Sequence, residues 1–92
     1  MHNAMVGWLK DKAMDGFDTM EAVKNVIRVV LARLNSISIM PCTNRIFTTG
    51  QGEEIAEVSF CGYTVSFDRE YTHNYISTFE YTYARFTLII EQ

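Results

Sequence analysis

Apolar and polar residues alternate along residues 54–92, the pattern of strands that bury one face of a sheet. If residues 69–75 form the connecting turn, the pairing is centred on Thr72. The residues of one face then meet as follows: Ser77 with Phe67, Phe79 with Val65, Tyr81 with Tyr63, Ala84 with Phe60, Phe86 with Val58, Leu88 with Ala56, and Ile90 with Glu54. Most of these pairs join two apolar side chains, the cross-strand contact that stabilises a sheet. The pattern therefore predicts one long β-hairpin in the C-terminal part of the chain.

The alternation changes phase near the middle of both arms of this hairpin. The change falls at Cys61-Gly62 on the first arm and at Tyr83-Ala84 on the second. A β-bulge shifts the phase by one residue, and glycine is a suitable residue for one, so we predict a shared kink that bends the hairpin. The alternative is a tight turn at Cys61-Gly62, which would divide the first arm into two short strands.

The N-terminal part has helical periodicity instead. Residues 3–14 predict a short helix that ends at Asp15-Gly16, where glycine takes the usual C-terminal position. Asp18 followed by Glu21 is a capping-box pattern, which predicts the start of a second helix. The apolar residues of that helix share one broad face: Met20, Val23, Val26, Ile27, Val30, Leu31 and Leu34. A face this wide predicts contact with both the sheet and the first helix.

Two more strands are expected between the second helix and the hairpin. Residues 36–40 alternate and stop at Pro41, residues 45–49 form another short run, and residues 50–52 contain the glycines of a turn. The element order predicts one α+β domain over residues 1–92. In it, two N-terminal helices pack on one face of an antiparallel sheet that ends in the long bent β-hairpin.

The expected hairpin is too long for the helices to cover. Each arm holds about 15 residues and spans roughly 50 Å, whereas the second helix spans only about 25 Å. The overhanging part is rich in large side chains, and an exposed apolar patch of this kind usually marks a protein interface. We assign partner binding to these residues: Tyr63, Phe67, Tyr71, Tyr75, Phe79 and Tyr81. We expect a protein partner, including a second copy paired by twofold symmetry.

Composition excludes several other partners. The chain of 92 residues has a net charge of −3, and its 8 basic residues are scattered, so we expect no nucleic-acid partner. Its longest apolar-rich stretch is too short to span a bilayer, and no secretory leader pattern is present. Cys42 and Cys61 fit a reduced, cytoplasmic protein, although the sequence leaves open whether they pair.

No residue cluster makes a convincing catalytic, cofactor or metal site. Asp68, Arg69, Glu70 and His73 would share the expected hairpin loop, where carboxylates and imidazole could bind a divalent metal or transfer protons. A solvated loop tip provides neither enough ligands nor a rigid cavity, so we prefer a polar turn. We expect Cys61 to be a small buried hydrophobe.

Methionines and the single tryptophan of the N-terminal part allow two interpretations. Met1, Met5, Met14 and Met20, together with Trp8, are expected to pack in the core or between the helices. The alternative is a partner-docking face that is made of Met1, Met5 and Trp8, because these residue types suit adaptable interfaces.

In size, mild acidity and lack of cofactor motifs, the chain resembles many small phage-encoded proteins. These include inhibitors of host defence such as anti-CRISPR proteins, and small ring-forming tail components; no motif is shared with either. We therefore expect a non-enzymatic protein-binding domain that occupies a partner's surface and self-associates. The alternatives are a structural subunit of a ring or tube, and a metal-dependent enzyme that uses residues 68–73.

Overall fold

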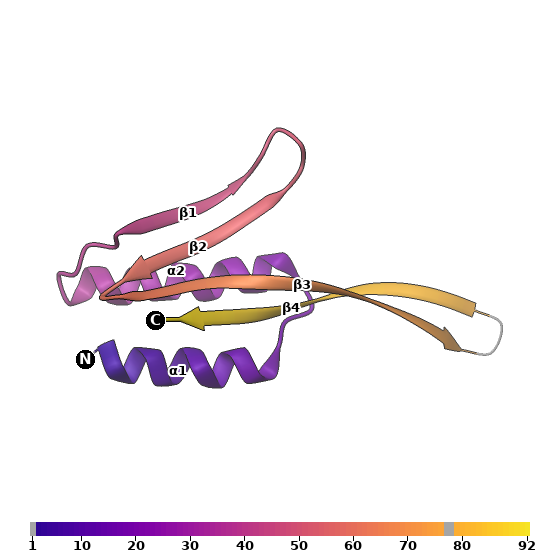
Figure 1. Ribbon diagram of the computed structural model, residues 1–92, viewed down its shortest axis with the longest axis horizontal. Helices are drawn as coiled ribbons and strands as arrows, with labels where there is room; N and C mark the ends of the chain where they lie inside the picture. Colours follow the sequence, from indigo (N-terminus) through magenta and orange to yellow (C-terminus); the bar gives the residue numbers. More distant parts are fainter. Residues whose placement is uncertain (1, 77–78) are drawn as a thin grey trace.

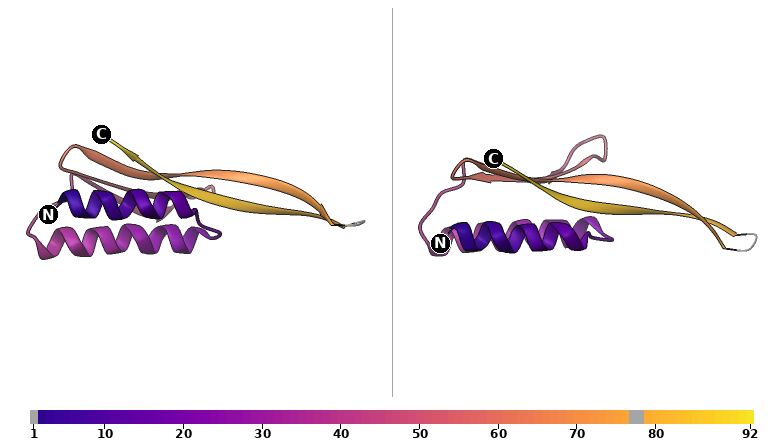
Figure 2. Two further views of the ribbon diagram at one scale, coloured as in Figure 1. Left: turned by 90° about the horizontal axis from the view of Figure 1, so that it is seen from below. Right: turned by 60° about the horizontal axis from the view of Figure 1, so that its bottom comes forward.

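A computed structural model of the chain shows two helices and a four-stranded antiparallel sheet, the predicted α+β fold (Figure 1). The elements are α1 (His2–Asp15), α2 (Met20–Ser36), β1 (Thr43–Thr48), β2 (Glu54–Phe60), β3 (Tyr63–Ile76) and β4 (Phe79–Glu91). The structure describes residues 2–76 and 79–92, with side chains for residues 3–71 and 84–92. The strands lie in the order β1-β2-β3-β4, and both helices cover the same face of the sheet (Figure 2).

One hydrophobic core lies between the helices and the sheet. The predicted apolar face of α2 is buried there, apart from Leu31, which is half-buried. The sheet contributes alternate residues, as the sequence pattern predicted: Ala56, Val58, Phe60, Val65, Phe86 and Leu88. From α1 come Met5, Val6 and Leu9. The hydrophobic pattern therefore predicted correctly which face of each element is buried.

The cap of α2 differs by one residue from the predicted one. Thr19 has an extended backbone, with φ −132° and ψ 150°, and its Oγ1 accepts a hydrogen bond of 3.2 Å from the Ala22 N–H. Asp18 was therefore the wrong choice, because the capping side chain must stand directly before the first helical residue to reach that N–H. Glu21 instead accepts a bond of 2.8 Å from Arg28 Nη1, which lowers the pKa of Glu21.

The strand expected over residues 36–40 is absent, because α2 continues to Ser36 and ends in a Schellman motif. Ser38 has a positive φ of 60°, and the Ile39 N–H donates to the Leu34 carbonyl at 2.9 Å. The Ser38 N–H donates to the Asn35 carbonyl at 3.2 Å, which completes the motif. The spacing of Ile37 and Ile39 belongs to this helix end rather than to a strand.

Cys61 and Gly62 form a tight turn between β2 and β3, so the predicted turn over residues 69–75 is wrong. The alternative was correct about the turn but not about a second short strand, because β3 continues to Ile76. Phe60 pairs with Tyr63 across the turn. Both central residues have positive φ, 48° and 81°, as a type I′ turn requires. Residues 69–75 lie inside β3. The observed long hairpin is β3–β4.

The pairing of β3 with β4 runs without a bulge from Thr64 with Glu91 to Ile76 with Phe79. The predicted shared kink is therefore wrong, and so are the predicted partners of the hairpin. Val65 pairs with Ile90 and Phe67 with Leu88. The connection at residues 77–78 lies outside the described residues.

We expect Cys61→Asn to raise the free energy of unfolding by about 0.5–1 kcal/mol, because asparagine tolerates positive φ better than most residues and Asn-Gly favours type I′ turns. Urea denaturation measures the effect. Cys42→Asn is the matched control: this cysteine is also exposed, but it has no positive φ. An equal gain from both substitutions would show that loss of the thiol, and not the turn, is responsible.

Candidate protein-binding surface

The β3–β4 hairpin projects well beyond the helices (Figures 1 and 2). The molecule measures 54 × 31 × 20 Å, and its radius of gyration is 15.2 Å. A compact chain of this length would have a radius of gyration of about 12 Å. The expected overhang is therefore present. We call residues 71–76 and 79–84 the arm.

The arm starts where the loop between the helices reaches β4. Phe17 exchanges two backbone hydrogen bonds of 2.8 Å with Phe86 and thereby covers the edge of β4 at that point. Arg85 Nη2 donates to the Asp15 carbonyl at 3.2 Å. Gly16 allows this approach, because a Cβ atom at Gly16 would lie 2.8 Å from Nε of Arg85. These contacts attach β4 to the helical layer at the base of the arm.

The aromatic core also ends at this level. The rings of Phe67 and Phe86 lie 6.0 Å apart, and the Arg69 guanidinium lies 5.1 Å from the centre of the Phe86 ring. Phe67 is half-buried against the core. The first arm residue of β3, Tyr71, is 64% exposed. The change from a half-buried to an exposed aromatic side chain thus occurs within four residues of β3, between Phe67 and Tyr71.

The six residues of the predicted patch are not gathered in one place. Tyr63 is half-buried at the opposite end of β3, with its ring 6.1 Å from that of Phe60. Phe67 belongs to the margin of the core, whereas Tyr71 lies exposed on the arm. The side chains of the other three, Tyr75, Phe79 and Tyr81, lie outside the described residues. Of the six, Tyr71 is therefore the described side chain best placed for a partner.

The cluster expected in a hairpin loop lies in the middle of β3. Asp68 pairs with Thr87 and Glu70 pairs with Arg85, so a continuous ladder replaces the loop. The His73 side chain lies outside the described residues. Among the side chains at residues 3–71 and 84–92, no group of three or more His, Cys, Asp or Glu could hold a metal ion.

The methionine and tryptophan side chains divide between the core and the surface. Met5 is buried, Met14 is 83% exposed and Met1 lies outside the described residues. The expectation that Met14 packs in the core or between the helices is therefore wrong. Trp8 is half-buried, with Arg33 at 5.0 Å and Lys12 at 5.9 Å from its ring centre. Two cations already cover this ring, so the Trp8 face offers little open apolar surface.

Both cysteines are exposed and free. Cys61 is therefore not the small buried hydrophobe that we expected, because its position in the tight turn keeps it at the surface.

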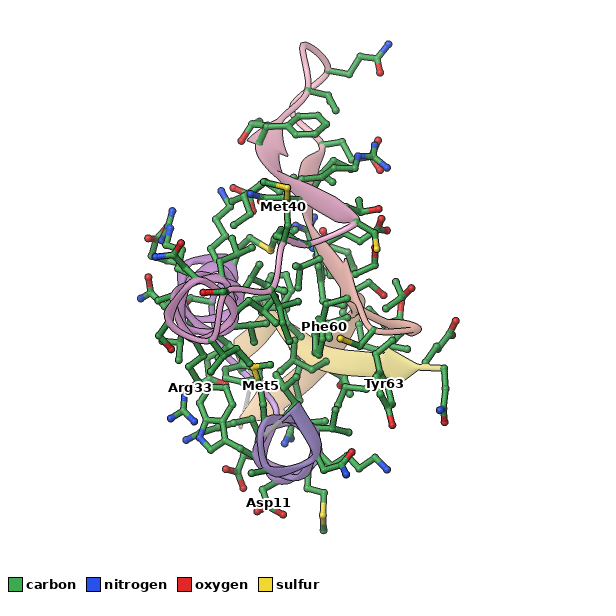
Figure 3. All side chains as sticks on the ribbon, turned by 90° about the vertical axis from the view of Figure 1, so that its left-hand side faces the viewer. Met5, Asp11, Arg33, Met40, Phe60 and Tyr63 are labelled. Atoms are coloured by element: carbon green, nitrogen blue, oxygen red, sulfur yellow. The ribbon has the colours of Figure 1, made fainter. Side chains whose placement is uncertain are left out.

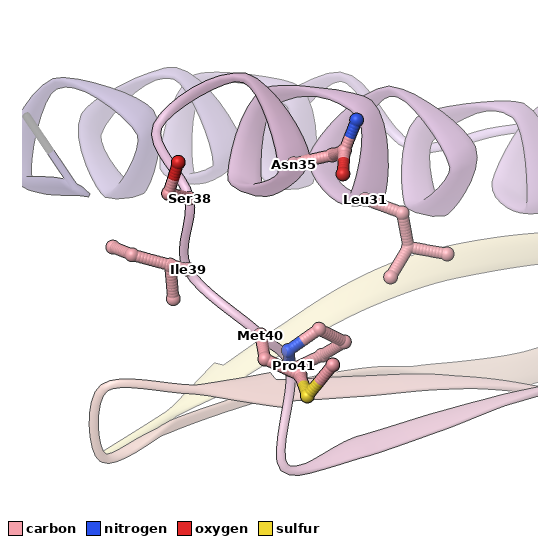
Figure 4. Close-up of a pocket in the computed structure, with 6 residues that line it drawn as sticks. All are labelled: Leu31, Asn35, Ser38, Ile39, Met40 and Pro41. Carbon is pink, nitrogen blue, oxygen red and sulfur yellow. The ribbon is translucent and has the colours of Figure 1, made fainter.

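A shallow hollow of about 250 Å³ lies beside the end of α2 (Figure 4). Its lining carries no charged side chain and no titratable group: Leu31, Asn35, Ser38, Ile39, Met40 and Pro41. It therefore supplies no group for catalysis.

A second feature, which the sequence analysis missed, lies between β2 and β3. These strands pair over only three positions, from Phe60 with Tyr63 to Val58 with Val65, and then diverge (Figure 1). We call the gap between residues 54–57 and 66–69 the fork. It contains two hollows of about 190 and 270 Å³. Their lining residues are Glu53, Glu54, Ile55, Ala56, Glu57, Ser66, Phe67, Asp68 and Arg69.

An ion-pair network spans the fork. Glu54 Oε2 lies 3.7 Å from Arg69 Nη2, and Glu54 Oε1 lies 3.6 Å from Lys24 Nζ on α2. All three side chains are partly exposed, so these pairs contribute little stability. They connect the diverging strands without closing the ladder. No sequence signal marks the fork, because it depends on how many β2–β3 pairs form after the turn.

No known protein-family model, curated protein or solved structure matches this chain. Within the described part of the chain, neither helix has the length and apolar content needed to cross a membrane.

Proposed function

We propose that this chain is a non-enzymatic, cytoplasmic protein-binding domain that acts by occupying a partner's surface and self-associates through the arm. The projection of β3–β4 beyond the helices carries this proposal. A two-stranded hairpin on its own is marginally stable in water, and open strand edges readily pair with another chain. A partner that covers the arm would remove both liabilities.

A second copy of the chain is the simplest partner for the arm. Twofold pairing places the same patch of each subunit against its copy, so one exposed residue such as Tyr71 contributes twice. Tyr75, Phe79 and Tyr81 remain predicted members of this surface. A dimer of this kind could block a host protein complex in the manner of a small phage inhibitor. That form of inhibition, anti-CRISPR-like, is the specific activity that we propose.

Head-to-tail association is the alternative, and the open edge of β1 favours it. In the sheet order, β1 is the edge strand opposite β4, and four of its six residues are exposed. An arm that paired with β1 of the next copy would make a heterologous contact, which generates rings or filaments. Electron micrographs distinguish a ring or tube subunit, which forms such polymers, from a discrete dimer. The placement of residues 68–73 in a strand gives the metal-dependent alternative no support.

We expect Tyr71→Ser to weaken self-association by about tenfold or more, because exposed tyrosines at the centre of interfaces often dominate binding. Sedimentation velocity over the micromolar range measures the dissociation constant. Phe47→Ser is the matched control, since Phe47 is also an exposed aromatic residue of the sheet, at 43%, but lies on β1. A wild-type chain that stays monomeric throughout this range would contradict self-association itself.

A further inference from the structure

We propose that the fork binds an extended, basic segment of a partner protein, which adds to the open edge of β3 as a further strand. This inference deepens the proposed function, because it names a second binding element and the chemistry of its ligand. It concerns the gap between residues 54–57 and 66–69, and not the arm. Three properties of the fork support it: backbone groups that lie outside the β2–β3 ladder, its charge and its apolar floor.

The backbone groups follow from the hairpin register. After a two-residue turn the flanking pair, Phe60 with Tyr63, exchanges hydrogen bonds, and every second pair beyond it does the same. Continuing this register would place Ala56 opposite Phe67 and Glu54 opposite Arg69. The strands diverge before either pair forms. The amide and carbonyl groups of these residues therefore face the fork, where an added strand could use them.

A side-chain contact shows that the edge of β3 is open. The N–H of Arg69 donates to Oδ1 of Asp68, its own neighbour, at 3.1 Å. In a continuous ladder this N–H would bond to β2. Opposite it, Glu54 contacts Arg69 through its side chain instead of its backbone. An incoming strand would offer the Arg69 N–H a backbone carbonyl in place of this local side-chain acceptor.

The charge of the fork favours a basic ligand. Glu53, Glu54, Glu57 and Asp68 line it, against two cations, the guanidinium of Arg69 and the ammonium of Lys24, which contacts Glu54. Among the described side chains, Glu54 is the one of these carboxylates that takes part in an ion pair. Lysine or arginine side chains of a ligand would therefore meet unpaired carboxylates. They could also replace Arg69 on Glu54.

The same charge argues against a second copy of this chain as the ligand. Residues 66–71, the edge segment that a copy would present, carry two carboxylates and one guanidinium. Acidic edges would then face each other in the fork, which costs free energy.

The half-buried Phe67 lines both hollows and supplies an apolar floor. Because side chains alternate along a strand, the matching ligand alternates basic and apolar residues.

A synthetic peptide of alternating valine and lysine, labelled with a fluorophore, tests the proposal on the full chain. We expect saturable binding by fluorescence anisotropy that weakens as salt is added. A peptide of alternating valine and glutamate is the charge control, and equal binding of both would overturn the proposal. Failure of the lysine peptide to bind at any salt concentration would also overturn it.

Backbone methylation of the peptide tests strand addition separately from charge. Methyl groups on all valine amides remove the donors of one strand edge, and methyl groups on all lysine amides remove those of the other. At least one of these peptides must lose binding if the ligand pairs as a strand. Unchanged binding of both peptides would overturn the proposal, because charge alone would then explain the affinity.

Substitutions in the fork locate the site. We expect the double variant Glu53→Gln/Glu57→Gln to bind the lysine peptide about fivefold more weakly, as the loss of two exposed ion pairs implies. The double variant Asp11→Asn/Asp18→Asn is the matched neutralisation, because it removes the same number of charges from exposed residues outside the fork; Asp11 lies on the outer side of α1 (Figure 3). Equal losses in both variants would show that the peptide responds to net charge rather than to the fork, and would overturn the proposal.

Sedimentation of the same samples separates this proposal from self-association through the arm. A wild-type chain that dimerises but does not bind the peptide refutes the fork and leaves the arm. A monomer that binds the peptide supports the fork and refutes the arm as a self-association element. We expect the Glu53→Gln/Glu57→Gln variant to retain its oligomeric state, because both substitutions lie outside the arm.

Discussion

A chain whose arm is replaced by Asn-Gly is expected to be a folded monomer. The variant deletes residues 71–84 and joins Glu70 to Arg85 through the new turn. These two residues are paired in the native ladder. Hydrogen-bonded and non-hydrogen-bonded pairs alternate along an antiparallel ladder. The pair of Glu70 with Arg85 is of the same kind as the pair of Ile76 with Phe79, which flanks the native connection. A two-residue type I′ turn therefore fits between them.

The shortened chain keeps the contacts that hold β3 and β4 to the helices. Among the described side chains, every fully buried one lies outside the deleted segment. The Phe17–Phe86 bridge remains, as does the contact of Arg69 with the Phe86 ring. Ala84, which is only partly buried, is the one described core contact that is lost. We therefore expect the free energy of unfolding to change by no more than about 1 kcal/mol.

Self-association, in contrast, should disappear. The deletion removes Tyr71, Tyr75, Phe79 and Tyr81 together with both open edges of the arm. Sedimentation velocity measures the oligomeric state, and circular dichroism in urea confirms the fold. The control replaces only residues 77–78 by Asn-Gly, which keeps the arm at full length. A shortened chain that still dimerises would refute the arm as the interface.

The long overhang could be predicted from the sequence because it follows from chain length and burial pattern. Strand faces and helix faces are set by which residues exclude water, and alternation reveals them directly. Val58 and Phe60 were assigned to the buried face without knowledge of their partners. Because a strand rises about 3.3 Å per residue and a helix only about 1.5 Å, the strands outreach the helices in either register.

The register could not be predicted, because the phase change at Cys61-Gly62 has two physical explanations. A bulge and a tight turn both shift the alternation by one residue. Asparagine or aspartate before Gly62 would have favoured a type I′ turn, but cysteine there gives no such signal. The second phase change, at Tyr83-Ala84, lies where β4 leaves the helices. The strand passes through it without a bulge.

The helix ends and the fork depend on local geometry that composition does not encode. Asp18 and Thr19 are both good N-caps, and only the starting residue of α2 selects Thr19. Ser38 takes a positive φ that glycine usually supplies, so the Schellman motif was not evident. The fork exists because β2 and β3 diverge after Val58 and Val65. With the turn placed at residues 69–75, the open edges of β2 and β3 could not be predicted.

Phe60→Ala should be among the most destabilising single substitutions in the chain. Among the described side chains, Phe60 is the largest that is fully buried, and it lies between the sheet and the helices (Figure 3). Its loss removes contacts with both layers and leaves a cavity, at a cost of about 3–5 kcal/mol. A domain of this size has a total free energy of unfolding of about 5–14 kcal/mol. The substitution therefore removes a large share of that stability.

Thermal and urea denaturation measure this loss directly. For a domain of this size, a cost of about 4 kcal/mol corresponds to a fall in Tm of about 20 °C. Phe47→Ala is the matched control, because this phenylalanine is on the exposed edge strand and should cost no more than about 0.5 kcal/mol. Phe67→Ala should fall between the two, since Phe67 is half-buried. Equal costs for Phe47 and Phe60 would mean that β2 does not face the helices. The type I′ turn, the fork and the arm all depend on that placement.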